Sequence, residues 1–214
     1  MNGARQIGKS YLIRYVGKKM FKNSVEINLK EDKESLGIFE TVRSTNDFYL
    51  QLGTMAGNRL GKKEDTLVFL DEIQSYPHLM TMLKFLNQEG KYTYIASGSQ
   101  LGVALSETAS VPIGSISVEE MYPLDFEEFL QITNISDDVI EHLKESFANR
   151  TPVMDAVNEK MLSLFNQYLV VGGMPEAVSK FSETYNVNDV MAIHKDIIDL
   201  YKLDFTQYET EDKR

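Results

Sequence analysis

The chain has 214 residues, of which 43% are hydrophobic and 25% are charged, and its net charge is -10. This composition is typical of a globular protein with one or two domains. Cysteine is absent, which excludes disulfides, thiol catalysis and cysteine-bound metals. No apolar run reaches the roughly 18 residues of a membrane helix, and no secretory leader opens the sequence. The acidic balance argues against broad nucleic-acid binding, so we expect a cytoplasmic protein without a membrane partner.

Strands and helices are predicted to alternate over the first part of the chain. Apolar, alternating or β-branched runs predict strands at residues 24–29, 66–70, 92–96 and 115–119. Apolar residues at helical spacing predict helices at residues 12–20, at 48–60 before Gly61, and from Pro77 to a stop at Gly90. This alternation indicates an α/β fold with a parallel sheet that is covered on both faces.

After Pro123 the pattern becomes helical only. Asp125 can cap a helix, and Glu128 three residues later would complete a capping box. Further helices are predicted around Val139, Leu143 and Phe147, over 154–170 before Gly172, from Pro175, and over 190–201. The predicted domains are therefore residues 1–125 and residues 126–214.

The first residues carry a motif that is typical of phosphate binding. Gly-Ala-Arg-Gln-Ile-Gly-Lys-Ser at residues 3–10 has the Walker A spacing. Glycines let backbone N–H groups converge on phosphate oxygens, and the following helix adds the positive end of its dipole. Lys9 would reach the β- and γ-phosphates, and Ser10 would bind Mg²⁺. The predicted ATP-binding residues are Gly3, Ala4, Arg5, Gln6, Ile7, Gly8, Lys9 and Ser10.

A second signal is an apolar run that ends in two acids, Leu-Val-Phe-Leu-Asp-Glu at residues 67–72. Adjacent side chains at the end of a strand point to opposite sides, so one acid can face a metal and the other a water molecule. Asp71 is predicted to hold Mg²⁺, and Glu72 to polarise the attacking water. The competing interpretation, a buried strand that meets solvent with charged residues, is disfavoured by the Walker A loop earlier in the chain.

The third signal, Tyr-Ile-Ala-Ser-Gly-Ser-Gln at residues 94–100, reads as the next strand of the sheet and its tip. A small polar residue there could sense the γ-phosphate or fix the water. Ser99 is the predicted catalytic residue, with Gln100 and Ser97 as alternatives. For each of them, a plain loop after a strand is the competing interpretation.

Together these segments resemble the bacterial and archaeal AAA-type ATPases that carry a C-terminal, nuclease-like domain of unknown function. The resemblance rests on residues 3–10, on Leu-Asp-Glu-Ile-Gln at 70–74 and on Ala-Ser-Gly-Ser-Gln at 96–100. Tyr-Pro-Leu-Asp-Phe-Glu-Glu-Phe-Leu at 122–130 and Gly-Gly-Met-Pro-Glu at 172–176 extend it over nearly the whole chain. These last two segments carry no obvious chemistry. Their presence therefore narrows the match from any P-loop protein to this family.

The resemblance implies a P-loop NTPase sheet followed by a helical lid or linker, and the chain departs from it in three places. Only Met1 and Asn2 precede the phosphate loop, so we expect the family's first strand to be missing. We expect the same of the family's C-terminal domain. Where the family often has a basic residue after the third signal, this chain reads Pro-Ile-Gly-Ser at 112–115. We therefore expect a fragment with an incomplete sheet.

The predicted function is ATP binding with Mg²⁺-dependent hydrolysis that drives a conformational change, with ATP and Mg²⁺ as cofactors. A protein partner or self-association is left open. One alternative is a nucleotide-gated interaction module with little turnover, which the missing basic residue favours slightly. Another is a truncated chain that keeps the motif without a folded site. A small-molecule kinase is disfavoured, because such kinases usually lack the paired acids of Asp71 and Glu72.

Overall fold

The computed structural model describes residues 1–98 and 117–211, with side chains described up to residue 203. The chain divides into two compact units, Met1–Tyr122 and Pro123–Arg214. The first unit combines a parallel sheet with helices, which confirms the predicted α/β class. The second unit is helical.

The sheet of the first unit has three described strands in the order β1-β2-β3, and all of its pairs are parallel. The strands are β1 (Asn23–Asn28), β2 (Thr66–Asp71) and β3 (Thr93–Ala96). In the register, Asn28 lies opposite Asp71, and Leu70 lies opposite Ala96. The carboxyl ends of the strands therefore meet at one edge of the sheet, where ligands bind in open α/β folds.

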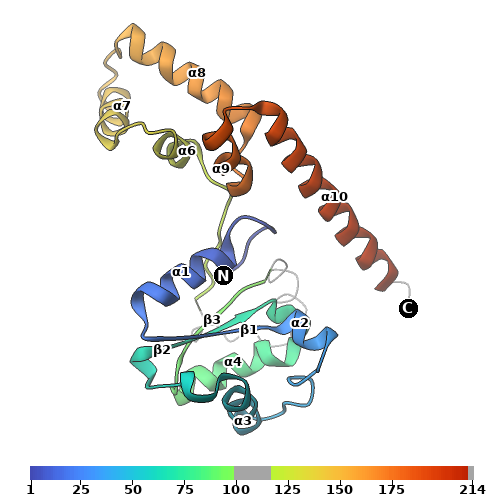
Figure 1. Ribbon diagram of the computed structural model, residues 1–214. Helices are drawn as coiled ribbons and strands as arrows, with labels where there is room; N and C mark the ends of the chain where they lie inside the picture. The colour runs from blue at the N-terminus through green and yellow to red at the C-terminus, as the bar shows by residue number, and fades with distance from the viewer. Residues whose placement is uncertain (99–116, 212–214) are drawn as a thin grey trace. The chain divides into compact units, whose positions relative to one another are not determined.

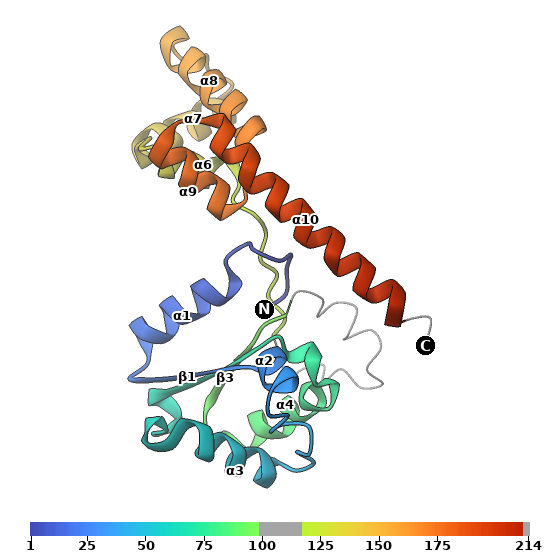
Figure 2. The same cartoon turned by 45° about the vertical axis from the view of Figure 1, so that its right-hand side comes forward.

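Helices cover both faces of this sheet. Helix α1 (Lys9–Met20) lies on one face, whereas α3 (Thr45–Ala56) and α4 (Pro77–Glu89) lie on the other, as both views show (Figures 1 and 2). Helix α4 begins at Pro77 and ends before Gly90, which takes a left-handed φ of 61°, as the sequence predicted.

Strand β2 is the centre of the core, because all six of its residues are buried. Its side chains alternate between the two faces, as the geometry of a strand requires. Leu67 and Phe69 pack with Ile13 of α1. Val68 and Leu70 join a larger cluster to which α3 contributes Phe48 and Leu52, and α4 contributes Leu79, Met82 and Leu86.

One helix prediction in this unit was wrong at its end, and one short helix was not predicted. Helix α3 ends at Ala56 rather than at residue 60, because Gly57 has a φ of 54° and opens a 3-10 turn, η1 (Gly57–Arg59). A short helix that was not predicted, α2 (Leu29–Glu34), begins where the first strand was expected to end. Its N-terminus is capped by the side chain of Asn28, which accepts a hydrogen bond from the Glu31 amide.

The strand predicted over 115–119 was also wrong in its described part, because residues 117–119 form no strand; residues 115 and 116 lie outside the described residues. A single parallel bridge joins Asn2 to Glu120 instead. The Asn2 amide donates to Glu119 O (2.8 Å), and the Met121 amide donates to Asn2 O (2.9 Å). The Met1 ammonium donates to Ala96 O at 2.6 Å. The entry to the predicted phosphate loop is therefore held at the end of β3.

The second unit consists of five described helices. They are α6 (Phe126–Ile132), α7 (Asp137–Asn149), α8 (Asp155–Val171), α9 (Pro175–Thr184) and α10 (Val187–Glu211). Asp125 and Glu128 form the predicted capping box, with both hydrogen bonds at 2.9 Å. The core of this unit includes the buried residues Phe129, Val171 and Phe181. Helix α7 buries Ile140, whereas Phe147, predicted for its apolar face, is 87% exposed.

The two units differ sharply in charge. Residues 1–122 contain 14 basic and 14 acidic residues, whereas residues 123–214 contain 8 basic and 18 acidic residues. The whole net charge of -10 therefore belongs to the helical unit. None of the described helices is both long and apolar enough to cross a membrane.

Candidate functional site

The predicted phosphate loop runs into the start of α1 and uses backbone conformations that favour glycine. Gly3 has a φ of 145°, and Gly8, which precedes α1, has a φ of 92°. A Cβ at Gly3 would lie 2.3 Å from Met121 O, so no larger residue fits there without movement. Arg5 and Gln6 form the turn between the glycines, and Gln6 has a left-handed φ of 63°.

Two side chains of the loop point inward. Ile7 is fully buried, and Lys9 is only 8% exposed. The Lys9 ammonium donates to Gly3 O at 2.8 Å and to Ala4 O at 2.5 Å, so it folds back over its own loop. Burial lowers the pKa of Lys9, and the nearby carboxylates of Glu72 and Asp71 partly oppose that shift.

Asp71, the last residue of β2, joins the loop to the sheet. Its Oδ2 accepts a hydrogen bond from Ser10 Oγ at 2.8 Å. Its Oδ1 accepts one from the fully buried Ser97, which directly follows β3. Asp71 is itself only 8% exposed. The first turn of α1 and the ends of two strands therefore meet at one carboxylate.

Glu72 lies one residue further on and has a left-handed φ of 55°. This conformation is uncommon for a residue with a side chain and occurs often at functional sites. The Glu72 carboxylate accepts a hydrogen bond from the side-chain amide of Gln74. Gln74 belongs to a short 3-10 turn, η3 (Ile73–Ser75), that follows directly.

The structure thus brings together Lys9, Ser10, Asp71 and Glu72, four of the residues predicted from the sequence. Ser99, the predicted catalytic residue, and Gln100 lie outside the described residues, as do residues 112–115. Sequence reasoning left Ser97 only as an alternative and missed Gln74. For Gln74, the one signal in the sequence was its position two residues after Glu72.

The donor atoms at this site suit magnesium. A hydroxyl and a carboxylate are hard oxygen ligands, and Mg²⁺ usually takes one or two protein ligands while water and phosphate supply the others. Ser10 and Asp71 present such a pair in direct contact. Among the described residues no group of three or more His, Cys, Asp or Glu side chains could form an all-protein metal cage.

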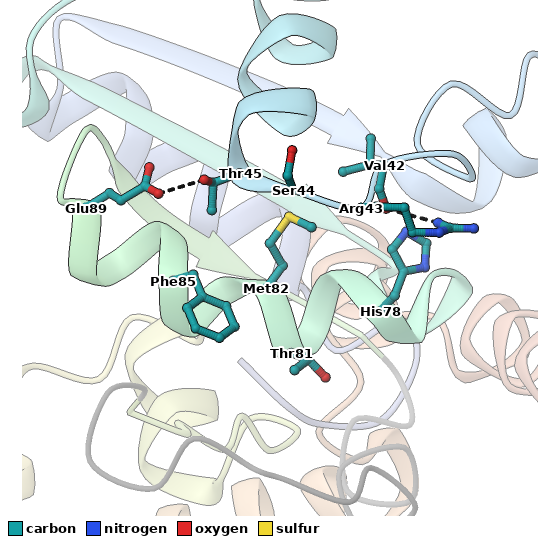
Figure 3. Close-up of a pocket in the computed structure, with 9 residues that line it drawn as sticks. All are labelled: Val42, Arg43, Ser44, Thr45, His78, Thr81, Met82, Phe85 and Glu89. Carbon is teal, nitrogen blue, oxygen red and sulfur yellow. Dashed lines mark hydrogen bonds between the residues drawn. The ribbon is translucent and has the colours of Figure 1, made fainter.

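A separate hollow of about 370 Å³ lies between residues 42–45 and one side of α4 (Figure 3). Met82 and Phe85 lie along it, and Thr45 donates to Glu89 at one end at 2.6 Å. None of the residues of the predicted phosphate site lines this hollow.

Comparison with known families shows which family the first part of the chain matches. The family model for an AAA domain matches residues 1–130, which include the loop, Asp71 and Glu72. The chain belongs to the AAA domain family. It is an ATP-binding, AAA-type protein with a P-loop NTPase fold. A second family model, for a domain of unknown function (DUF8612), matches residues 162–214.

No curated protein matches this AAA domain chain. Among solved structures, PCH-2 from C. elegans is similar to it, with 13% identity and a TM-score of 0.45. That match covers 94% of this chain and 59% of the PCH-2 chain, so the chain spans less than two thirds of PCH-2. The nuclease-like domain implied by the sequence resemblance stays a prediction.

Proposed function

We propose that the chain binds Mg-ATP through residues 3–10 and hydrolyses it slowly to drive a conformational change. The observation that carries this proposal is the hydrogen bond between Ser10 and Asp71. It places the hydroxyl of the Walker A segment beside the first acid of the pair, on different elements of the fold. These are the two protein ligands that P-loop NTPases use for Mg²⁺.

Each residue of the candidate site has a separate role in this proposal. The loop amides and Lys9 hold the phosphates, and Lys9 exchanges its bonds to Gly3 O and Ala4 O for phosphate oxygens. Bound Mg²⁺ supplies charge neutralisation on the phosphate oxygens. Ser10 and Asp71 hold the metal, Ser97 keeps the Asp71 carboxylate in place, and Glu72 orients the attacking water. Residues 126–214 are proposed to act as a lid or linker that follows the nucleotide state.

Calorimetry of ATP binding with and without Mg²⁺ tests this proposal, combined with phosphate release under the same conditions. Lys9→Ala should abolish binding, whereas Glu72→Gln should retain binding and stop hydrolysis. Lys84, exposed on α4, offers a control, because Lys84→Ala should change neither quantity.

The outcomes separate the alternatives. Micromolar binding without turnover would favour a nucleotide-gated interaction module over an ATPase. Absence of ATP binding below millimolar concentration would contradict the proposed function altogether.

A further inference from the structure

Gln74 makes an unusual pair with Glu72. A carboxylate can only accept hydrogen bonds, so the amide nitrogen of Gln74 must face it. The amide oxygen of Gln74 is then left buried, and it has no hydrogen-bond partner among the described residues. A buried acceptor without a partner costs free energy, and such groups in native structures call for a functional explanation.

The backbone under this pair is fixed. Ile73, between the two residues, is fully buried, and its amide donates to Ser97 O at 3.1 Å. The Ser75 amide donates to Glu72 O at 3.0 Å, which closes the 3-10 turn. The left-handed conformation of Glu72 turns its side chain toward a residue only two positions away. The contact between Glu72 and Gln74 is therefore a product of this turn.

The charge of Lys9 indicates what the hydrogen bond between Gln74 and Glu72 does. Among the charged neighbours of Lys9, Glu72 has the largest effect on the pKa of the Lys9 ammonium, larger than that of Asp71. An unrestrained Glu72 carboxylate would be drawn to this ammonium, because the two opposite charges share a partly buried site. The hydrogen bond from Gln74 instead holds Glu72 on η3, and Lys9 donates to the loop carbonyls.

We propose that Gln74 is the positioning residue for Glu72. Its side-chain amide donates to the carboxylate and holds it away from Lys9, while its own carbonyl oxygen stays buried without a partner among the described residues. This inference rests on the proposed ATPase function. Gln74 itself touches neither nucleotide nor metal in this role.

Gln74→Met tests the role, because methionine keeps the length of the side chain and removes its hydrogen bonds. The expected result is a fall in kcat of about tenfold with an unchanged KM for ATP. Gln51→Met is the matched control, since Gln51 is a similarly half-buried glutamine on α3. It should leave both constants unchanged.

A second variant separates positioning from packing. Gln74→Glu keeps the shape of the side chain but sets a second carboxylate against Glu72, so its kcat should fall further than that of Gln74→Met. In a Glu72→Gln background, Gln74→Met should have almost no additional effect on the affinity for ADP–aluminium fluoride, because the group that it positions is already lost. A purely structural role would instead add its full effect in that background.

A binding readout makes the test independent of turnover. The wild-type chain should bind ADP–aluminium fluoride with Mg²⁺ more tightly than ADP, because the fluoride complex mimics the transferring phosphoryl group. Gln74→Met should remove most of this preference while ADP affinity stays unchanged.

The outcomes are distinguishable. No nucleotide binding by the wild-type chain would contradict the proposed function itself. A wild-type chain that binds ADP but shows no preference for the fluoride complex would overturn the inference, as would unchanged kcat and preference in Gln74→Met. A higher kcat in Gln74→Met would also overturn it, because Gln74 would then hold Glu72 in an inactive position.

Discussion

At the scale of single residues, the candidate site converges on Asp71. Each of its carboxylate oxygens accepts a hydrogen bond from a serine, Ser10 on one side and Ser97 on the other. Hydrogen bonds to a carboxylate restrict its rotation and hold it ready for a ligand. The first acid of the pair is thus fixed by two elements that are distant in sequence.

Gly3 is the glycine of the loop at which a substitution should be most damaging. In Gly3→Ala the new Cβ would lie 2.3 Å from Met121 O, in a backbone conformation that alanine rarely adopts. We expect nucleotide affinity, measured by calorimetry, to fall at least tenfold, by about 1.4 kcal/mol or more.

Gly53 provides the control for this substitution. It lies inside α3, and a Cβ there would meet no atom within 4 Å. Gly53→Ala should keep full nucleotide affinity and raise the free energy of unfolding by about 0.5–1 kcal/mol, because alanine suits a helix interior better than glycine. Equal losses of affinity in both variants would contradict the role assigned to Gly3.

Lys9 should make ATP binding depend on pH. Burial lowers its pKa in the free chain, and a bound phosphate would raise it. Between these two values binding must take up a proton, so affinity should fall as the pH rises through the lowered pKa of the free chain. Calorimetry in buffers with different ionisation enthalpies should show proton uptake that grows as the pH is raised toward the ordinary pKa of lysine, about 10.4. Binding heats that do not depend on the buffer over this whole range would contradict this assignment.

The sequence indicates those candidate-site residues whose pattern is local. The spacing of residues 3–10 and the two acids that follow an apolar strand are visible from residue types alone. The contact of Ser97 with Asp71 could not be, because it depends on the register of two parallel strands. The role of Gln74 depends on the left-handed turn at Glu72, which residue types alone do not indicate.

At the scale of elements, the strands were predicted better than the short helices. Strands β1 to β3 are apolar or alternating runs, and burial in a sheet dictates such a pattern. Helix α2 has only six residues, Leu-Lys-Glu-Asp-Lys-Glu, which is too short to show helical periodicity. Its stability comes from tertiary contacts, which a local pattern does not contain.

Asp32 supplies a polar tertiary contact of α2. Its buried carboxylate accepts hydrogen bonds from the amides of Ile38 and Phe39, both at 3.2 Å, and from the Tyr76 hydroxyl at 2.9 Å. Tyr76 directly precedes α4, so this one side chain joins α2, the segment after it and the start of α4.

Asp32→Ala should therefore destabilise the first unit strongly. It would leave three donors without partners, and each buried, unpaired group costs about 1–3 kcal/mol. We expect a loss of about 3 kcal/mol or more in the free energy of unfolding, measured with urea. Tyr76→Phe removes one of the three bonds and should cost about 1 kcal/mol. A loss below that of Tyr76→Phe would refute the assignment.

At the scale of the whole molecule, the chain consists of two units, each with its own hydrophobic core. The candidate site lies entirely in the first unit. That unit has balanced charge, so its net charge does not oppose the approach of a nucleotide, whereas the helical unit carries the whole excess of acids. The excess of negative charge and the candidate nucleotide site therefore belong to different units of the chain.

The two cores should unfold in two separate steps. Mg-ATP at about 100 times its Kd should stabilise only the step of the first unit, by about 2.7 kcal/mol. Phe181→Ala, in the core of the helical unit, should lower only the other step, by about 3–5 kcal/mol. Scanning calorimetry of the two proteins with and without nucleotide checks both effects. A single transition that shifts as a whole in every case would contradict this independence.

The alternation along β2 has a consequence for how the gene can change. Asp71 shares its side of the strand with Leu67 and Phe69, the side that faces α1 and therefore Ser10. One inserted or deleted residue within β2 would move the side chains beyond it to the opposite faces of the sheet. The same change would turn Asp71 away from the phosphate loop. Substitutions can alter this strand gradually, but a change in its length would remove packing and chemistry together. Natural length variation among relatives should therefore fall in the loops on either side of β2 and not within it.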